Sequence, residues 1–182
     1  MFLRTFFGAI ALSVLLIKPG WAEVELLDIP ACSELELRVA GLFRVGTARL
    51  YLDNCHEARN QILSPVPKQF SLRLARPFSG QDLSETAYDL LRRNLHLTED
   101  EPLPESLACL AKAYVDGEPG DRFDVTYRPE IGLALRLNGN LVQFCEDASY
   151  AEQYFSIWFG DEPFHRRMRE VLLDRAENSD RG

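Results

Sequence analysis

The stretch SYAEQYFSIWFGDEP, from Ser149 to Pro163, decides the fold. It is typical of a helix that ends at Gly160 and is followed by an acidic turn and a proline. Five of the six residues from 154 to 159 are large and apolar, whereas a half-buried helix needs an apolar residue only at every third or fourth position. Burying each such side chain contributes roughly 1.5–3 kcal/mol. The pattern therefore predicts a helix buried on nearly all sides, which we expect a β-sheet formed by the preceding strands to cover.

Six segments before this helix alternate between apolar and polar residues, which is the pattern of half-buried strands. Gly41 and Gly46 interrupt the alternation between the first two segments, as a tight hairpin or a bulge does. The last three segments are expected to form an antiparallel meander, whose final turn, Asn138-Gly139-Asn140, is a strong signal for a type I′ hairpin. The six segments are residues 35–39, 47–53, 70–75, 122–128, 133–138 and 141–146.

Helical spacing of apolar residues occurs at three further places, and we expect helices there. Ser79 is a favourable N-cap for the first of them, and Gly117 is expected to end the second. A polar, proline-bearing connection is expected at residues 54–67, and a frayed polar tail at residues 176–182. The three predicted helices span residues 79–95, 105–115 and 164–175.

The first 22 residues have the three parts of a secretory signal peptide. Arg4 supplies the positive charge, residues 6–17 form the apolar run, and small residues precede a cleavage site after Ala22. The alternative is a retained membrane anchor, but the run is shorter than the ~20 residues that span a bilayer. We therefore expect a periplasmic protein with no stable membrane span, whose residues 23–175 form one domain. The formal net charge of the full chain, −8, disfavours nucleic acid as a partner.

Four cysteines remain after cleavage, at Cys32, Cys55, Cys109 and Cys145. An even number in an exported chain favours one or two structural disulfides, although four cysteines allow three pairings and buried free thiols are the alternative. The cysteines are too widely spaced for a CxxC redox or zinc motif. The three histidines show no metal-binding spacing, so we expect neither a metal site nor a cofactor.

A few polar residues are candidates for binding a ligand. Arg73 and Arg76 flank the strand that leads into the first helix, where an arginine can hold a carboxylate through two hydrogen bonds. Tyr51 and Tyr127 are candidate hydroxyl donors. The competing interpretation is structural, with the arginines on a solvated strand face and the tyrosines in the core or at a sheet edge.

Several motifs, taken in order, resemble the chalcone isomerase-like superfamily, and most closely its exported bacterial branch. The resemblance covers roughly residues 35–173. It implies an α+β fold, an open-faced β-sandwich in which a large antiparallel sheet has helices packed on one face. The motifs that carry it are Arg49–Leu52, Pro77–Glu85, Pro119–Phe123, Leu137–Gly139 and Phe155–Gly160.

The resemblance also implies where a ligand would bind. In the plant enzymes of this superfamily, a cleft between sheet and helices holds a flavanone and closes its ring, and in plastid relatives the cleft binds fatty acids. The catalytic threonine of the enzymes falls near Gly46 or Thr47, with Gly46 fitting the spacing better. The catalytic tyrosine falls on Leu83 and the asparagine on Leu90. Two leucines on one helix face can line an apolar cleft, but they cannot polarise a ketone.

We therefore expect a non-catalytic exported protein that binds an apolar or fatty-acid-like ligand between sheet and helices. The candidate ligand-binding residues are Tyr51, Arg73, Leu83, Leu90 and Tyr127. One alternative is a scaffold that docks another protein of the cell envelope. A second alternative is an isomerase that acts on an enone through other groups, such as Arg73 and Tyr127.

Overall fold

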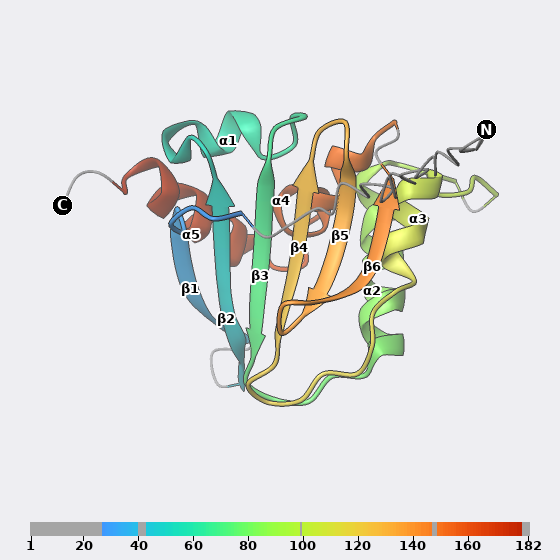
Figure 1. Ribbon diagram of the computed structural model, residues 1–182, viewed down its shortest axis with the longest axis horizontal. Helices are drawn as coiled ribbons and strands as arrows, with labels where there is room; N and C mark the ends of the chain where they lie inside the picture. The colour runs from blue at the N-terminus through green and yellow to red at the C-terminus, as the bar shows by residue number, and fades with distance from the viewer. Residues whose placement is uncertain (1–26, 40–42, 99, 147–148, 180–182) are drawn as a thin grey trace, which may run out of the picture.

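Six strands form one antiparallel sheet in which each strand pairs with the next along the chain (Figure 1). This computed structural model describes residues 27–39, 43–98, 100–146 and 149–179, so the predicted signal peptide and Gly41 lie outside the described residues. All six predicted strands are present. They are β1 (Ser33–Val39), β2 (Phe43–Leu52), β3 (Lys68–Leu74), β4 (Arg122–Arg128), β5 (Gly132–Leu137) and β6 (Asn140–Glu146).

The longer helices pack against one face of this sheet and leave the other face open (Figure 1). Contacts join α5 to β1 and β2 at one edge and α3 to β5 and β6 at the other, and α4 packs against α2 between them. The predicted α+β, open-faced architecture is therefore confirmed. The helices are η1 (Cys55–Glu57), α1 (Ala58–Gln61), α2 (Gly80–Asn94), α3 (Glu105–Ala111), η2 (Ala151–Phe155), α4 (Ser156–Phe159) and α5 (Arg166–Glu177).

The buried stretch at residues 149–163 lies where the sequence predicts it, against the helix-bearing face of the sheet. Tyr154, Phe155 and Phe159 are almost completely buried, and Trp158 is only 8% exposed. Its form differs from the single predicted helix, because a 3₁₀ segment, η2, leads into one α-helical turn, α4. A 3₁₀ segment is more tightly wound than an α-helix, and short runs of it are common at α-helix ends.

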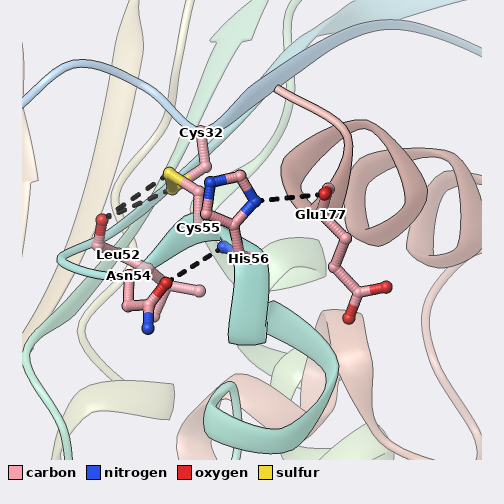
Figure 2. The surroundings of a disulfide bond; sticks show 6 residues. All are labelled: Cys32, Leu52, Asn54, Cys55, His56 and Glu177. Carbon is pink, nitrogen blue, oxygen red and sulfur yellow. Dashed lines mark hydrogen bonds between the residues drawn. A yellow bond between two sulfur atoms is a disulfide. The ribbon is translucent and has the colours of Figure 1, made fainter. Parts of the chain in front are cut away.

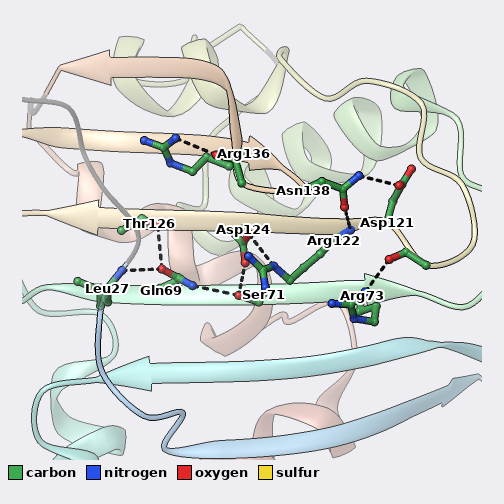
Figure 3. Close-up of polar contacts among 12 residues, drawn as sticks. Leu27, Gln69, Ser71, Arg73, Asp121, Arg122, Asp124, Thr126, Arg136 and Asn138 are labelled. Atoms are coloured by element: carbon green, nitrogen blue, oxygen red, sulfur yellow. Dashed lines mark hydrogen bonds and ion pairs between the residues drawn. The ribbon is translucent and has the colours of Figure 1, made fainter.

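Strand alternation assigns each side chain to one face of the sheet. On β3, Phe70 and Leu74 are buried on the helix-bearing face, and Ser71 and Arg73 point to the open face (Figure 3). The predicted β5–β6 hairpin is confirmed. Asn138 and Gly139 adopt φ values of 54° and 84°, as a type I′ turn requires at its two central positions.

Four differences from the predictions exceed a shift of one or two residues at an element end. The connection at residues 54–67 contains η1 and α1, which are too short to show a helical period. Helix α3 ends at Ala111, and Gly117 pairs with Phe78 instead of capping the helix. Strand β2 begins at Phe43 and runs through Gly46. Helix α5 continues to Glu177 with Ala176 buried, so the helix reaches into the predicted tail.

The four cysteines form two disulfides, and no described cysteine is free, so the prediction of structural disulfides is confirmed. Cys32–Cys55 joins the segment before β1 to η1, next to the C-terminal end of α5, whose Glu177 carbonyl lies 3.2 Å from Nδ1 of His56 (Figure 2). Cys109–Cys145 joins α3 to β6. Among the helices formed by described residues, none is long and apolar enough to cross a membrane.

Candidate functional site

An apolar pocket of about 70 Å³ lies between the sheet and the helices. Leu37, Phe70, Leu72, Phe123 and Val125 line it from the sheet. On the helical side, α2 contributes Leu83, Thr86 and Ala87, and α4 contributes Ile157 and Trp158. Three further residues complete the lining, namely Tyr114 after α3, Phe164 before α5 and Met168 in α5. Among the described residues that line the pocket, none carries a charged side chain. The pocket can therefore hold an apolar group, but it offers nothing to neutralise an ion.

Aromatic stacking forms one wall of this pocket. The rings of Phe70 on β3 and Trp158 on α4 are stacked with their centroids 4.2 Å apart and an interplanar angle of 21°. Tyr154 and Phe155 meet the Trp158 ring edge to face, at 6.1 and 5.9 Å. Such pairs contribute about 0.5–1.5 kcal/mol beyond the area they bury. This cluster holds α4 against the centre of the sheet.

Asn94, the last residue of α2, fixes the turn that follows α4. Its side-chain amide donates to the carbonyl of Glu162 at 3.0 Å, and its Oδ1 accepts from the Glu162 N–H at 2.9 Å. Gly160 packs directly against this amide, since an added Cβ would lie 2.2 Å from Oδ1 of Asn94. Gly160 is therefore required by the close contact with Asn94 of α2. This contact in turn positions Ile157 and Trp158.

The start of α2 holds the segment that carries Tyr114. The N–H of Gly80 donates to the carboxylate of Asp116 at 2.8 Å, and Phe78 and Gly117 exchange two backbone hydrogen bonds of 2.9 Å. A Cβ at Gly80 would lie 2.6 Å from the carbonyl carbon of Val115. Helix α2 and this segment thus pack backbone to backbone, which fixes the position of Tyr114.

A hydroxyl pair lies at this side of the pocket. The hydroxyl of Tyr154, a residue with no exposed surface, donates to the hydroxyl of Tyr114 at 3.4 Å. Burial raises the pKa of Tyr114 to about 12, although its bond with Tyr154 acts in the opposite direction. Burial, followed by the interaction with Tyr114, raises the pKa of Tyr154 well above the ordinary value. Both hydroxyls therefore stay protonated at neutral pH and remain hydrogen-bond donors.

The sequence-based candidates do not come together at one place. Leu83 lines the apolar pocket, and Leu90 is buried on the same helix outside the lining. Gly46 pairs with the pocket residue Leu37. Tyr127 is buried on the helix-bearing face. Arg73 and Tyr51 lie on strand positions that face the open side.

Arg73 lines a separate polar hollow on the open face, of about 90 Å³, together with Arg49 and Arg122. It donates to the carbonyl of Gly120 at 2.8 Å (Figure 3). Arg73 and Tyr127 therefore lie on opposite faces of the sheet and cannot act together on one substrate, which removes the basis for an isomerase that uses both. Arg76 instead stacks on the ring of Phe78, with Cζ 4.8 Å from the ring centroid.

The open face also carries a polar network whose members satisfy one another. Ser71 donates to one carboxylate oxygen of Asp124 at 2.5 Å, and Arg122 donates to the other at 2.9 Å (Figure 3). Gln69 donates to Ser71 and accepts from Thr126 and from the backbone N–H of Leu27. A saturated network of this kind stabilises the sheet and leaves little polar capacity for a ligand.

Lys68 is a buried cation that the sequence analysis did not identify. It lies on the helix-bearing face of β3, and its Nζ donates to the carbonyls of Ile62 and Ser64 at 2.7 and 2.5 Å. Nζ also lies 5.3 and 5.2 Å from the ring centroids of Tyr127 and Phe155. Burial lowers the pKa of Lys68 to about 7, with Glu152 acting in the opposite direction. Its inward position was readable from the alternation with Phe70.

Among the described residues, no group of three or more histidine, cysteine, aspartate or glutamate side chains is placed to hold a metal ion. The chemistry available in the apolar pocket is therefore that of hydrophobic contact and of a few uncharged donors.

Comparisons with known proteins agree with this architecture. A family model described as chalcone isomerase-like matches residues 35–174. No curated protein matches the chain. Among solved structures, the fatty-acid binding protein AtFAP1 of Arabidopsis thaliana is similar, with a TM-score of 0.58 and 17% identity over 86% of this chain and 92% of that chain. At this identity, the structural likeness establishes the fold and not the ligand.

Proposed function

The chain belongs to the chalcone isomerase-like family, and on that premise we propose that it binds an apolar or acyl small molecule between the sheet and the helices. The observation that carries the proposal is the pocket itself, whose described lining consists mainly of apolar side chains from β3, β4, α2 and α4 and includes no charged one. The structural likeness to a fatty-acid binding protein supports the same class of ligand.

We propose further that the protein is not an isomerase. The resemblance aligns catalytic residues of the plant enzymes with Leu83, with Leu90 and with Gly46 or Thr47, of which Gly46 fits the spacing better. Gly46, Leu83 and Leu90 have no side chain that can donate a hydrogen bond to a carbonyl or stabilise a phenoxide. Thr47 lies beside Arg73 in the polar hollow on the open face, away from the apolar pocket. A threonine at position 46 would also meet the backbone, because a Cβ there would lie 2.1 Å from the carbonyl oxygen of Arg73.

The size of the pocket sets a condition on binding. Ligand pockets typically measure about 300–1,000 Å³, and an engineered cavity of about 150 Å³ admits benzene. A volume of about 70 Å³ therefore requires lining side chains to move before an acyl chain enters. Phe164, which is 41% exposed, and the half-buried Leu83 are among the lining residues with room to do so.

Export to an oxidising compartment is part of the proposal. Two disulfides support it, since structural disulfides persist outside the reducing cytosol. We propose that residues 1–22 are a cleaved signal peptide, and that the protein is periplasmic and belongs to the exported bacterial branch of the family.

Thermal-shift titrations with fatty acids, methyl esters and alcohols of 8 to 16 carbons test the binding proposal. A ligand that binds the folded state at 100 times its Kd stabilises it by about 2.7 kcal/mol. Replacing the pocket residue Thr86 with Trp should abolish the shift by filling the space. Replacing its exposed neighbour Glu85 with Trp should preserve it.

The small volume of the pocket favours a second candidate, a scaffold whose core is closed and whose surface docks another protein of the cell envelope. That candidate predicts the absence of a thermal shift with every chain length in the unmodified protein, and a protein that co-purifies with it at a fixed ratio.

A further inference from the structure

The hydroxyl pair of Tyr114 and Tyr154 has more donors than the pair itself can use. Two hydroxyls carry two protons, and only one proton can lie between the two oxygen atoms. Tyr154 donates its proton to Tyr114, and the proton of Tyr114 has no acceptor within the described part of the chain. Whichever way the shared bond is oriented, one O–H group is left over. Tyr114 is half-buried, and a donor left without an acceptor at such a site is unfavourable, so an occupant that accepts its proton is favoured.

The unused donor belongs to the apolar pocket, because Tyr114 is one of its lining residues. A second donor lines the same pocket. It is the indole N–H of Trp158, a lining residue whose ring contacts Phe70, Tyr154 and Phe155. The uncharged polar groups at this site are thus chiefly donors. Indole N–H donates only, and Tyr114 already accepts from Tyr154.

We propose that Tyr114 anchors the head group of the ligand, and that this head group is an uncharged hydrogen-bond acceptor, namely the carbonyl oxygen of a ketone, ester or amide. This inference rests on the proposed function and specifies the ligand class more closely. A carbonyl oxygen accepts up to two hydrogen bonds and complements a site that offers donors. Acceptance of a bond from Tyr154 also strengthens Tyr114 as a donor, because chains of hydrogen bonds polarise one another.

A carboxylate fits this pocket less well than a carbonyl does. In the part of the chain that the structure describes, none of the lining side chains is a lysine, arginine or histidine, and a buried carboxylate without a cation carries a large desolvation cost. Lys68 lies on the same face of β3, but it is not part of the lining and already donates to Ile62 and Ser64. A carboxylic acid is therefore expected to enter the pocket in its protonated form.

Three aromatic probes of similar shape test the inference on the oxidised, full-length protein, namely ethylbenzene, acetophenone and benzoate. Their dissociation constants are measured by titration at pH 7.5. In Tyr114→Phe we expect acetophenone to bind about 3- to 10-fold more weakly, the effect of one hydrogen bond, with ethylbenzene changed less than about 2-fold. Benzoate should bind most weakly of the three at pH 7.5 and more tightly as the pH falls toward the pKa of benzoic acid.

Two variants control for the removal of a hydroxyl as such. Tyr150→Phe removes one from a residue that is 59% exposed, and it should leave all three constants unchanged. Tyr88→Phe removes the hydroxyl of a half-buried residue of α2 outside the lining and should preserve the acetophenone affinity. Equal losses for acetophenone and ethylbenzene in Tyr114→Phe would overturn the inference, as would benzoate binding more tightly than acetophenone at pH 7.5. If ethylbenzene binds but the dissociation constants show none of these differences between probes, the head-group inference fails while the proposed apolar pocket remains supported. Failure of every probe and every acyl ligand would overturn both proposals.

Discussion

Trp158 stacks on Phe70 with 4.2 Å between ring centroids, and this pair joins the buried α4 turn to the middle strands of the sheet. The contact links two segments singled out from the sequence, the apolar stretch near the C-terminus and the alternating strand predicted at residues 70–75. It also forms a wall of the apolar pocket. The residues that hold the fold together are therefore in part the residues that would meet a ligand.

Trp158→Ala should lower the free energy of unfolding by about 3–5 kcal/mol, because it removes a large buried side chain and leaves a cavity beside Phe70. Urea denaturation followed by circular dichroism measures the loss. Phe43→Ala serves as the control, since Phe43 is 61% exposed and its loss should cost less than about 0.5 kcal/mol. Similar losses in both variants would contradict the central position assigned to Trp158.

Lys68 should make stability rise with pH above neutrality. An unfolded lysine holds its proton up to about pH 10.5, whereas burial lowers the pKa of the folded one to about 7. Between these values unfolding takes up a proton, so the free energy of unfolding increases with pH. The contribution of this group approaches 1.4 kcal/mol per pH unit at most. Below about pH 7 the lysine is protonated in both the folded and the unfolded state, so this group adds no pH dependence there.

The comparison with Lys68→Met isolates this contribution from all other titrations. The stability of the unmodified protein relative to the variant should increase between pH 7 and pH 9, as measured by urea denaturation at each pH. Lys112→Met replaces an exposed lysine and should show a pH-independent difference. A flat difference for Lys68→Met as well would mean that Lys68 keeps its proton, held by the Ile62 and Ser64 carbonyls.

Gly46→Thr, which restores the threonine expected from the plant enzymes, should destabilise the protein by about 1–3 kcal/mol through overpacking. The new Cβ would lie 2.1 Å from the backbone oxygen of Arg73, and backbone on the paired strand β3 cannot move aside cheaply. Thr47→Ser, at the next residue on the open face, is the control and should be nearly neutral. A stable Gly46→Thr protein would show that β2 and β3 can separate locally.

Removal of either disulfide should cost about 2–4 kcal/mol, since cross-links of this span restrict the unfolded chain. The two bridges close loops of similar length, with sequence separations of 23 and 36 residues. Paired serine substitutions at Cys32 and Cys55, or at Cys109 and Cys145, can be compared by thermal unfolding. A loss for one pair only would show that the other bridge is dispensable for stability.

Strand periodicity and turn chemistry predicted most of this fold, because both are local properties of the chain. The β5–β6 hairpin depends only on Asn138 and Gly139, and the N-cap of α2 depends on Ser79, whose hydroxyl accepts from the N–H of Asp82. The end of α3 was predicted wrongly. Gly117 forms a β-bridge with Phe78, which lies 39 residues earlier in the chain. A pattern of neighbouring residues cannot predict a pairing over that distance.

The candidate site was less predictable than the fold. Leu83 was identified through the resemblance and lines the pocket. The pairing of Tyr114 with Tyr154 spans 40 residues and depends on how α2 packs against the segment after α3. The place of Arg73 on the open face, in contrast, was implied by its alternation with Phe70, Leu72 and Leu74, so strand geometry alone could have separated it from the apolar pocket.

Native mass spectrometry of the protein purified from the periplasm, followed by organic extraction of bound molecules, tests the central claim most directly. We predict a stoichiometric mass of an apolar or acyl compound that is released on denaturation, on a chain that begins at Glu23 and carries two disulfides. A clean ligand-free mass, with no uptake of any added acyl compound, would contradict the binding function and favour the scaffold.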